Sequence, residues 1–448
     1  MVMSTKPSAL ANKLIAVLAA CLVVILVVLP VHAFISTWGG TAIGPLLAWK
    51  SWKEILLAAL IPLVIWVCVL RPDVARAVWG KWYNKLIAAY VVLTLIMAAA
   101  SQASGEAVVA GILMNLRFLF VFVVAQVVLA SGLPWVEKLK KQLTTWLIAT
   151  GALLAIVALL QVTLLPKDFL AHFGYNKDTT ISPYLLIDDD PNALRAFATM
   201  RGPNTLASYL LLPLAVVLVI WWQSRKQWWA AGSAVLMAAA IFATHSRSGW
   251  LGAAAMAATL AFVVLPRAVL AKWLKFGTVP AILLVGVVLW FATTVPAVRL
   301  AVFHSGGNDP TESLTEGSSD KHWQAAADGV AAIVREPVGT GVGSAGPASF
   351  YNTNNGALIP ENYFVQIGQE VGVVGLALFV AISFALGREL WRARRSGLWP
   401  QVLFASFIGI NLINIFLHGW ADDPTAITWW ALAGLTLGAD QTKKVQSK

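Results

Sequence analysis

The segment LIAVLAACLVVILVVLPV, residues 14–31, contains no charged side chain. At 1.5 Å per residue, about 20 apolar residues cross the hydrocarbon core of a bilayer as a helix. Working outward, similar apolar runs recur along the chain without a visible internal repeat, and the full set begins near Leu14, Ile55, Leu86, Ala107, Leu143, Thr205, Trp228, Trp250, Ala281, Asn362, Val402 and Ile427. The sequence therefore predicts an all-α polytopic membrane protein with about 12 transmembrane helices, built as a single membrane domain over residues 1–448.

The composition excludes a water-soluble globular protein. Hydrophobic residues make up 59% of the chain and charged residues only 12%, too few to cover a soluble surface. Many of the 21 tryptophans flank the apolar runs, where their rings suit the headgroup layer. The net charge of +11 would suggest nucleic acid for a soluble protein, but here we expect bilayer lipids and no nucleic acid. Cys21 and Cys68 lie inside apolar runs, which argues against a disulfide or a metal site.

The basic residues predict how the chain is oriented. They gather in alternate connections, at residues 71–85, 138–141, 225–226, 267–275 and 388–395, as expected for cytoplasmic turns. We therefore expect a bacterial inner-membrane protein with both termini in the cytoplasm and two long periplasmic loops, residues 167–204 and 299–361. Val31-His32-Ala33 loosely resembles a signal-peptide cleavage site, but the apolar run before it is too long, and an uncleaved helix is favoured.

Three of the arginines on the predicted periplasmic side stand at or just above membrane depth, against the bias of the basic residues. Arg195 and Arg201 close the first loop, and Arg247 lies in a short turn at or just above membrane depth. A guanidinium at that depth is costly unless an anion or a water-filled cavity receives it. The alternatives are interfacial snorkelling or pairing with Asp188, Asp189 and Asp190 for the first two, and a buried salt bridge for Arg247.

The second loop contains a predicted amphipathic helix near residues 320–335, with Asp320 as its N-cap, Pro337 as its stop and Trp323 packed on the spans.

The glycine-rich segment 339–346 follows this helix. No strand precedes it, so it is not a dinucleotide fingerprint, although its backbone N–H groups can meet a phosphate or let a sugar approach. Glu361 begins the next transmembrane helix, where it can act chemically or as a cap. Glu370 lies deeper and can be a buried, hydrogen-bonded carboxyl.

These segments together resemble the O-antigen ligase and O-antigen polymerase superfamily of bacterial inner-membrane glycosyltransferases. The resemblance rests on three stretches in order: RGPNTLASYL at 201–210, SRSGW at 246–250, and the block from Trp323 through Pro337, Gly339, Gly341 and Gly343 to Asn362 and Gly372. It covers about residues 195–376 and is closest to the lipopolysaccharide O-antigen ligases. Where members typically carry His-Asn after the large loop, this sequence has Glu361-Asn362.

The resemblance implies an inverting, metal-independent enzyme of GT-C type without a cofactor. Such an enzyme moves a glycan from undecaprenyl pyrophosphate to a sugar hydroxyl of lipid A-core. Arg195, Arg201 and Arg247 would bind the diphosphate, because guanidinium groups grip phosphate oxygens in a fork. Glu361 is the first candidate for the general base and His322 the second. The residues expected to position the glycan or the loop are Lys321, Trp323, Gly341, Gly343 and Asn362.

Two other classes of function remain open from the sequence. An O-antigen polymerase or a protein O-oligosaccharyltransferase would use the same donor with a different acceptor. A transporter or flippase could line an anion path with the arginines, although transporters usually hold their polar residues near the midplane of several helices. Here the polar residues concentrate on one rim.

Overall fold

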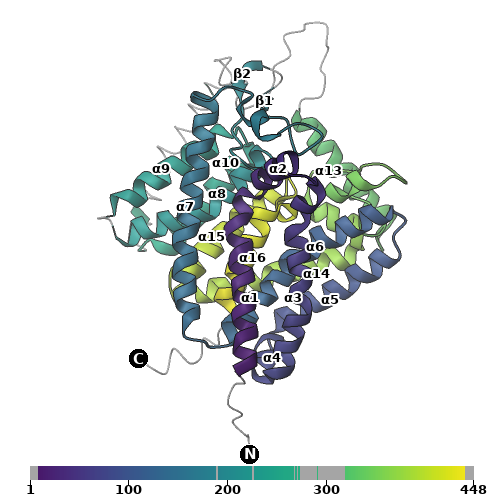
Figure 1. Ribbon diagram of the computed structural model, residues 1–448, viewed down its shortest axis with the longest axis vertical. Coiled ribbons are helices and arrows are strands. Elements are labelled where there is room, and N and C mark those ends of the chain that lie inside the picture. Colours follow the sequence, from purple (N-terminus) through teal and green to yellow (C-terminus); the bar gives the residue numbers. More distant parts are fainter. Residues whose placement is uncertain are drawn as a thin grey trace, which may run out of the picture.

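The computed structural model describes residues 9–438 except 188–189, 225–226, 267, 270, 273–289 and 291–317 (Figure 1). Helices make up most of it, because long apolar runs in a bilayer satisfy every backbone polar group only as helices or closed barrels. The helices are α1 (Ala9–Val28), α2 (His32–Ala42), α3 (Leu46–Leu70), α4 (Pro72–Trp79), α5 (Trp82–Ala99), α6 (Gly105–Ala130), α7 (Trp135–Thr163), α8 (Pro203–Gln223), α9 (Trp228–Ala243), α10 (Arg247–Val264), α13 (Ser318–Arg335), α14 (Tyr363–Ala393), α15 (Leu398–Asn414) and α16 (Asp423–Leu437).

The prediction of an all-α polytopic membrane protein is confirmed. Within the described residues, eight helical segments are long and apolar enough to cross a membrane, the first being α1 and α2 joined by the 3-10 turn η1 (Leu29–Val31). Two shorter apolar helices, α9 and α15, and the helix α16 coincide with three more of the predicted runs. The run that begins near Ala281 lies outside the described residues.

Figure 1 shows two ends of the helix bundle. One end carries α2, α13 and the segment between α7 and α8, and we refer to it as the loop face. The opposite end carries α4. The predicted first loop on the loop face contains a 3-10 helix, η2 (Phe169–Phe173), and a small antiparallel hairpin of β1 (Leu186–Ile187) and β2 (Asp190–Leu194). The sequence did not predict this hairpin.

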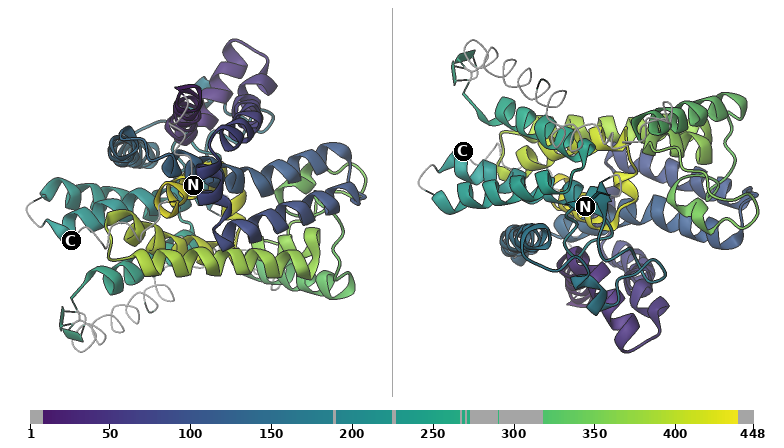
Figure 2. Two further views of the ribbon diagram at one scale, coloured as in Figure 1. Left: turned by 90° about the horizontal axis from the view of Figure 1, so that it is seen from below. Right: turned by 90° about the horizontal axis from the view of Figure 1, so that it is seen from above.

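The helix α16 lies at the centre of the bundle. In both views of Figure 2 its yellow segment lies where the purple, blue and teal groups of helices meet. Gly434 allows the close approach of α16 to α6, since a Cβ atom there would lie 2.5 Å from the Phe122 carbonyl oxygen. Trp429 and Trp430 are fully buried beside Trp420 of the 3-10 turn η4 (Gly419–Ala421), which leads into α16. Any group at the start of α16 is therefore held firmly under the loop face.

The glycine-rich segment wraps around a kink in α14. Gly372 has a φ of 74° inside this helix, which frees the Val373 N–H to donate to the Pro337 carbonyl at 2.9 Å. Glu370 is fully buried, and its carboxylate accepts hydrogen bonds from Asn115 Nδ2 at 2.7 Å and Gly343 N–H at 2.7 Å. Glu370 is thus the buried, hydrogen-bonded carboxyl that its position predicts, and it fastens the segment to α14.

Candidate functional site

Arg195 and Arg247 lie together on the loop face. The Arg195 Nε donates to the Thr244 carbonyl at 3.1 Å, and its Nη2 donates to Asn204 Oδ1 at 3.4 Å. Arg247 is the first residue of α10, after the N-cap Ser246, whose hydroxyl accepts the Gly249 N–H. Burial, with the positive charge of Arg247 second, lowers the pKa of Arg195 to about 10. Two cations held near each other in this way suit a doubly charged anion.

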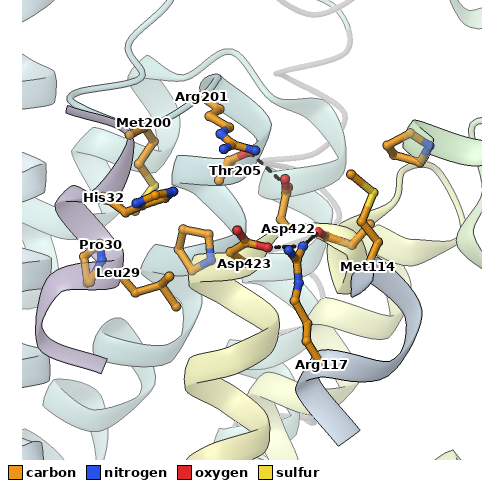
Figure 3. A pocket seen from close by; sticks show the side chains of 14 residues that line it. Leu29, Pro30, His32, Met114, Arg117, Met200, Arg201, Thr205, Asp422 and Asp423 are labelled. Atoms are coloured by element: carbon orange, nitrogen blue, oxygen red, sulfur yellow. Dashed lines mark hydrogen bonds and ion pairs between the residues drawn. The ribbon is translucent and has the colours of Figure 1, made fainter. Parts of the chain in front are cut away.

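Arg201 lines a cavity of about 90 Å³ (Figure 3). The walls come from distant parts of the chain: Leu29, Pro30, His32, Ala33, Met114, Arg117, Met200, Arg201, Thr205, Pro347, Ala421, Asp422, Asp423 and Pro424. Arg201 itself is exposed, so its guanidinium can be reached from outside the bundle. It stands two residues before α8, whose residue Asn204 contacts Arg195. The first turn of α8 therefore contacts the cavity through Thr205 and Arg195 through Asn204.

Asp422 faces this cavity from the residue before α16. Its Oδ2 accepts a hydrogen bond from the Thr205 hydroxyl of α8 at 3.0 Å (Figure 3). Burial raises the pKa of Asp422 to about 6, and the charges of Arg201 and Arg117 oppose that rise. A carboxyl with this pKa is still ionised at neutral pH and accepts protons more readily than an ordinary aspartate.

An ion network lies along one wall of the cavity, to which Arg117 and Asp423 contribute. Asp423 forms an ion pair with Arg117 of α6 and lies 3.1 Å from Lys53 Nζ of α3. Glu54 Oε1 lies 2.8 Å from Lys53 Nζ and 3.3 Å from Arg117 Nη1. The Lys53 ammonium also lies 3.2 Å from His32 Nε2. These charges are mutually neutralised, which allows them to lie so deep in the bundle.

Glu361 lies on the loop face beside the connection between α15 and α16, residues 415–422. The structure differs from the prediction that Glu361 begins a helix. Asn362 is the N-cap of α14, accepting the Phe364 and Val365 N–H groups, and Glu361 precedes it with a φ of 52°. Asn362 Nδ2 donates to the Ile415 carbonyl and the Tyr363 N–H to the Leu417 carbonyl. Burial lowers the pKa of nearby His418 to about 4, and the negative charge of Glu361 opposes this effect.

The remaining predicted residues occupy α13 and the glycine-rich segment. α13 covers Ser318–Arg335, so it begins two residues before the expected N-cap. It carries Lys321, His322 and Trp323, whose side chains lie outside the described part of the chain. The Gly341 N–H donates to the Glu370 carbonyl and the Gly343 N–H to its carboxylate, so both amides are occupied within the protein and do not point to a phosphate. Both glycines have positive φ and close neighbours, which fits loop positioning.

Sequence reasoning missed His32, Asp422 and Asp423. One signal was available: Arg117 lies within an apolar run, and a cation at that depth requires an acidic partner near the end of another span. Asp422 and Asp423 occupy such a position. In the described residues, no group of three or more His, Cys, Asp and Glu side chains is arranged to hold a metal ion.

Comparison with known families adds one finding. Residues 232–380 match the model of a family described as O-antigen ligase. The match includes Arg247, the glycine-rich segment and Glu361, while Arg195, Arg201 and Asp422 lie outside it. No curated protein matches the sequence.

Proposed function

Because the chain is a member of the O-antigen ligase superfamily, we propose that it transfers an O-antigen glycan from undecaprenyl pyrophosphate to a sugar hydroxyl of lipid A-core. The family supports ligase or polymerase activity on lipid-linked substrates in general. We further propose that the transfer inverts the configuration of the sugar, that it needs no metal ion, and that the enzyme is of the GT-C type.

One observation carries this proposal: the arginine-lined cavity on the loop face. Arg201 lines the cavity, and Arg195, beside Arg247, donates to Asn204, the neighbour of the cavity residue Thr205. A polyprenyl diphosphate holds its charge at the membrane surface, so guanidinium groups at the end of a helix bundle are at a suitable height to meet it. A transporter path would instead require polar groups distributed along several spans near the midplane.

The proposed glycan transfer has two chemical requirements. The donor sugar is already activated by its diphosphate, so the enzyme must stabilise the departing diphosphate and remove a proton from the attacking hydroxyl. Guanidinium groups fixed in advance stabilise the charge that develops on the leaving oxygen without reorganising. Arg195, Arg201 and Arg247 would provide this stabilisation. Glu361 and His322 are the proton acceptors that the sequence predicts.

We also propose that the loop face is periplasmic and that the membrane is the bacterial inner membrane. The basic residues of the opposite end support this orientation, since Arg71 is the N-cap of α4, Arg76 lies in its last turn, and Arg388 lies above Trp82 at the start of α5. The donor lipid would then enter sideways from the outer leaflet.

Replacement of Arg247 by alanine tests the function. Incubation of the purified Arg247→Ala protein with undecaprenyl-pyrophosphate glycan and lipid A-core should give about 100-fold less ligated product than wild type, because the leaving diphosphate loses a fixed cation. Arg76→Ala, on the exposed surface of α4, is the matched control and should retain full activity. Product formation is measured with and without a chelator, and with a second lipid-linked glycan as acceptor to detect polymerase activity.

Full activity of Arg247→Ala would remove the leaving-group role. Loss of product with chelator would contradict the metal-independent mechanism, and extension of the lipid-linked glycan in place of lipid A-core would make the protein a polymerase. Membrane insertion is verified with an Asp178→Cys reporter on the loop face, labelled to the same extent in both proteins by an impermeant thiol reagent.

A further inference from the structure

Two adjacent carboxylates at the start of α16 have different surroundings. Asp423 is paired with Arg117 and with Lys53, so its charge is fixed by two cations. Asp422 accepts a hydrogen bond from the neutral Thr205 hydroxyl, and among the described residues no cation lies within ion-pair distance of it. Neighbouring acids held in unlike environments commonly divide their roles, one remaining charged and the other exchanging a proton.

The side chain of Asp422 is not used as a helix cap. Asp422 is the N-cap residue of α16, where an aspartate usually accepts the N–H groups of the first turn. Its carboxylate makes no such bond, and Pro424 removes one of the possible donors. The side chain instead reaches Thr205 of α8 and lines the cavity together with Arg201 (Figure 3). Its orientation therefore needs an explanation other than helix stability.

We propose that Asp422 accepts the proton of the incoming sugar hydroxyl inside the cavity that Arg201 lines. This inference rests on the proposed transferase function and assigns its proton acceptor to a residue that the family match does not include. The ion network of Lys53, Glu54, Arg117 and Asp423 acts as the fixed support that holds Asp422 in place.

The step balances without a further reactant. The hydroxyl oxygen of the acceptor attacks the anomeric carbon of the donor sugar, while the bond from that carbon to the diphosphate oxygen breaks. The electron pair leaves with the diphosphate, which Arg201 meets as an anion. The hydroxyl proton passes to the Asp422 carboxylate and then to solvent through the opening beside the exposed Arg201.

The electrostatics around Asp422 agree with this role. Burial raises its pKa to about 6, Asp423 adds to the rise, and Arg201 and Arg117 oppose it. The other charged or titratable side chains in the cavity wall are His32 of α2, Arg117, Arg201 and Asp423. Wild-type kcat/KM should accordingly fall as the pH decreases below about 6, where the carboxylate takes up its proton before the substrate arrives.

Asp422→Asn tests the inference, because the amide keeps the shape and can still accept the Thr205 hydrogen bond. With undecaprenyl-pyrophosphate glycan and lipid A-core, turnover should fall about 100-fold or more while donor binding changes less than about 3-fold. Asp422→Glu should recover part of the turnover and shift the acidic limb of the pH profile. Asp178→Asn, an exposed carboxyl on the same face, is the matched control, and Glu361→Gln is measured in parallel.

Each outcome of these measurements supports or contradicts the role of Asp422. Full turnover in Asp422→Asn, or a loss of turnover matched by an equal loss of donor binding, would overturn the inference and leave the transferase function standing. Loss of turnover confined to Glu361→Gln would return the proton acceptor to Glu361. If the wild-type protein binds the donor but yields no product with any offered acceptor, the proposed function fails, and this inference fails with it.

Discussion

At the scale of single residues, burial near the loop face keeps the imidazole of His418 uncharged. Its Nε2 atom is buried and has no hydrogen-bond partner among the residues that the structure describes. Burial lowers its pKa to about 4, despite the nearby carboxylate of Glu361. His418 is therefore neutral at physiological pH, and the connection between α15 and α16 adds no positive charge to the arginines.

This burial should make the stability of the protein depend on pH. Since the unfolded chain protonates His418 near pH 6.5 and the folded protein only near pH 4, the free energy of unfolding decreases by up to about 3 kcal/mol as the pH falls between these values. His418→Gln should remove this loss. We expect the midpoint of thermal unfolding in detergent to fall less for the variant than for wild type between pH 7 and pH 4.

The comparison with the variant is essential because Asp422 acts in the opposite direction. Its folded pKa of about 6 exceeds its ordinary value of 3.8, so its contribution favours the folded state at low pH and is lost as the pH rises through 6. Parallel pH curves for wild type and His418→Gln would show that the imidazole is solvated in the folded protein.

The sequence predicted the arginines but not the groups around them. Arg195, Arg201 and Arg247 were detectable because cations outside the cytoplasmic turns conflict with the general charge bias. Asp422 follows a short turn and looked like an ordinary end of a span. Its significance depends on Thr205 and Arg201, which are remote in the chain and meet it only in the folded bundle.

At the scale of elements, the kink of α14 depends on a single glycine. Gly372 adopts a φ of 74°, and a Cβ atom there would collide with the Val338 and Pro337 carbonyl groups. The kink joins the segment 337–346 to α14 through the Val373 N–H, the Thr340 N–H and the Gly341 N–H. The kink thus fixes the position of the segment 337–346 against α14, which an unkinked helix would not do.

Gly372→Ala should therefore destabilise the protein by about 3 kcal/mol or more, through both backbone strain and overlap. Gly356→Ala is the matched control, because Gly356 also has a positive φ of 75° but a Cβ atom there would meet nothing within 4 Å. We expect the control to cost only about 1 kcal/mol. Equal decreases in the unfolding midpoint of the two variants would show that overlap at the kink contributes nothing.

The elements themselves could be predicted far better than their irregularities. Apolar length alone indicated the spans, because a bilayer imposes a minimum number of residues. The start of α14 was placed wrongly at Glu361, since Asn362 is the stronger cap and only hydrogen bonds reveal which residue acts. The hairpin of β1 and β2 is too short to give a periodic pattern.

At the scale of the whole molecule, buried charge joins helices from three parts of the sequence. Lys53, Arg117 and Asp423 come from α3, α6 and α16, and their side chains are almost entirely buried. Ion pairs at this depth add little net stability when complete, but losing one partner leaves an uncompensated charge. One sequence cannot predict which helices pair in this way, because the order of helices around α16 depends on contacts between remote spans.

Asp423→Asn should consequently lower the free energy of unfolding by about 3–5 kcal/mol, because Arg117 and Lys53 then share only Glu54. Glu137→Gln provides the comparison, since the side chain of Glu137 is 67% exposed and pairs with Lys140 at 3.2 Å. That variant should change stability by less than about 0.5 kcal/mol. Similar unfolding midpoints for the two variants would mean that water reaches the network.

The central position of α16 also has a consequence for biosynthesis. During translation, the helices that surround it leave the ribosome first, and α16 follows all of them along the chain. The earlier helices must therefore remain apart in the lipid, or close around α16 late, before Arg117 and Lys53 meet their counter-charge. A nascent chain interrupted before α16 would contain Arg117 and Lys53 with Glu54 as their single shared carboxylate, so one positive charge would lie unneutralised in the membrane, a state that quality-control proteases can recognise.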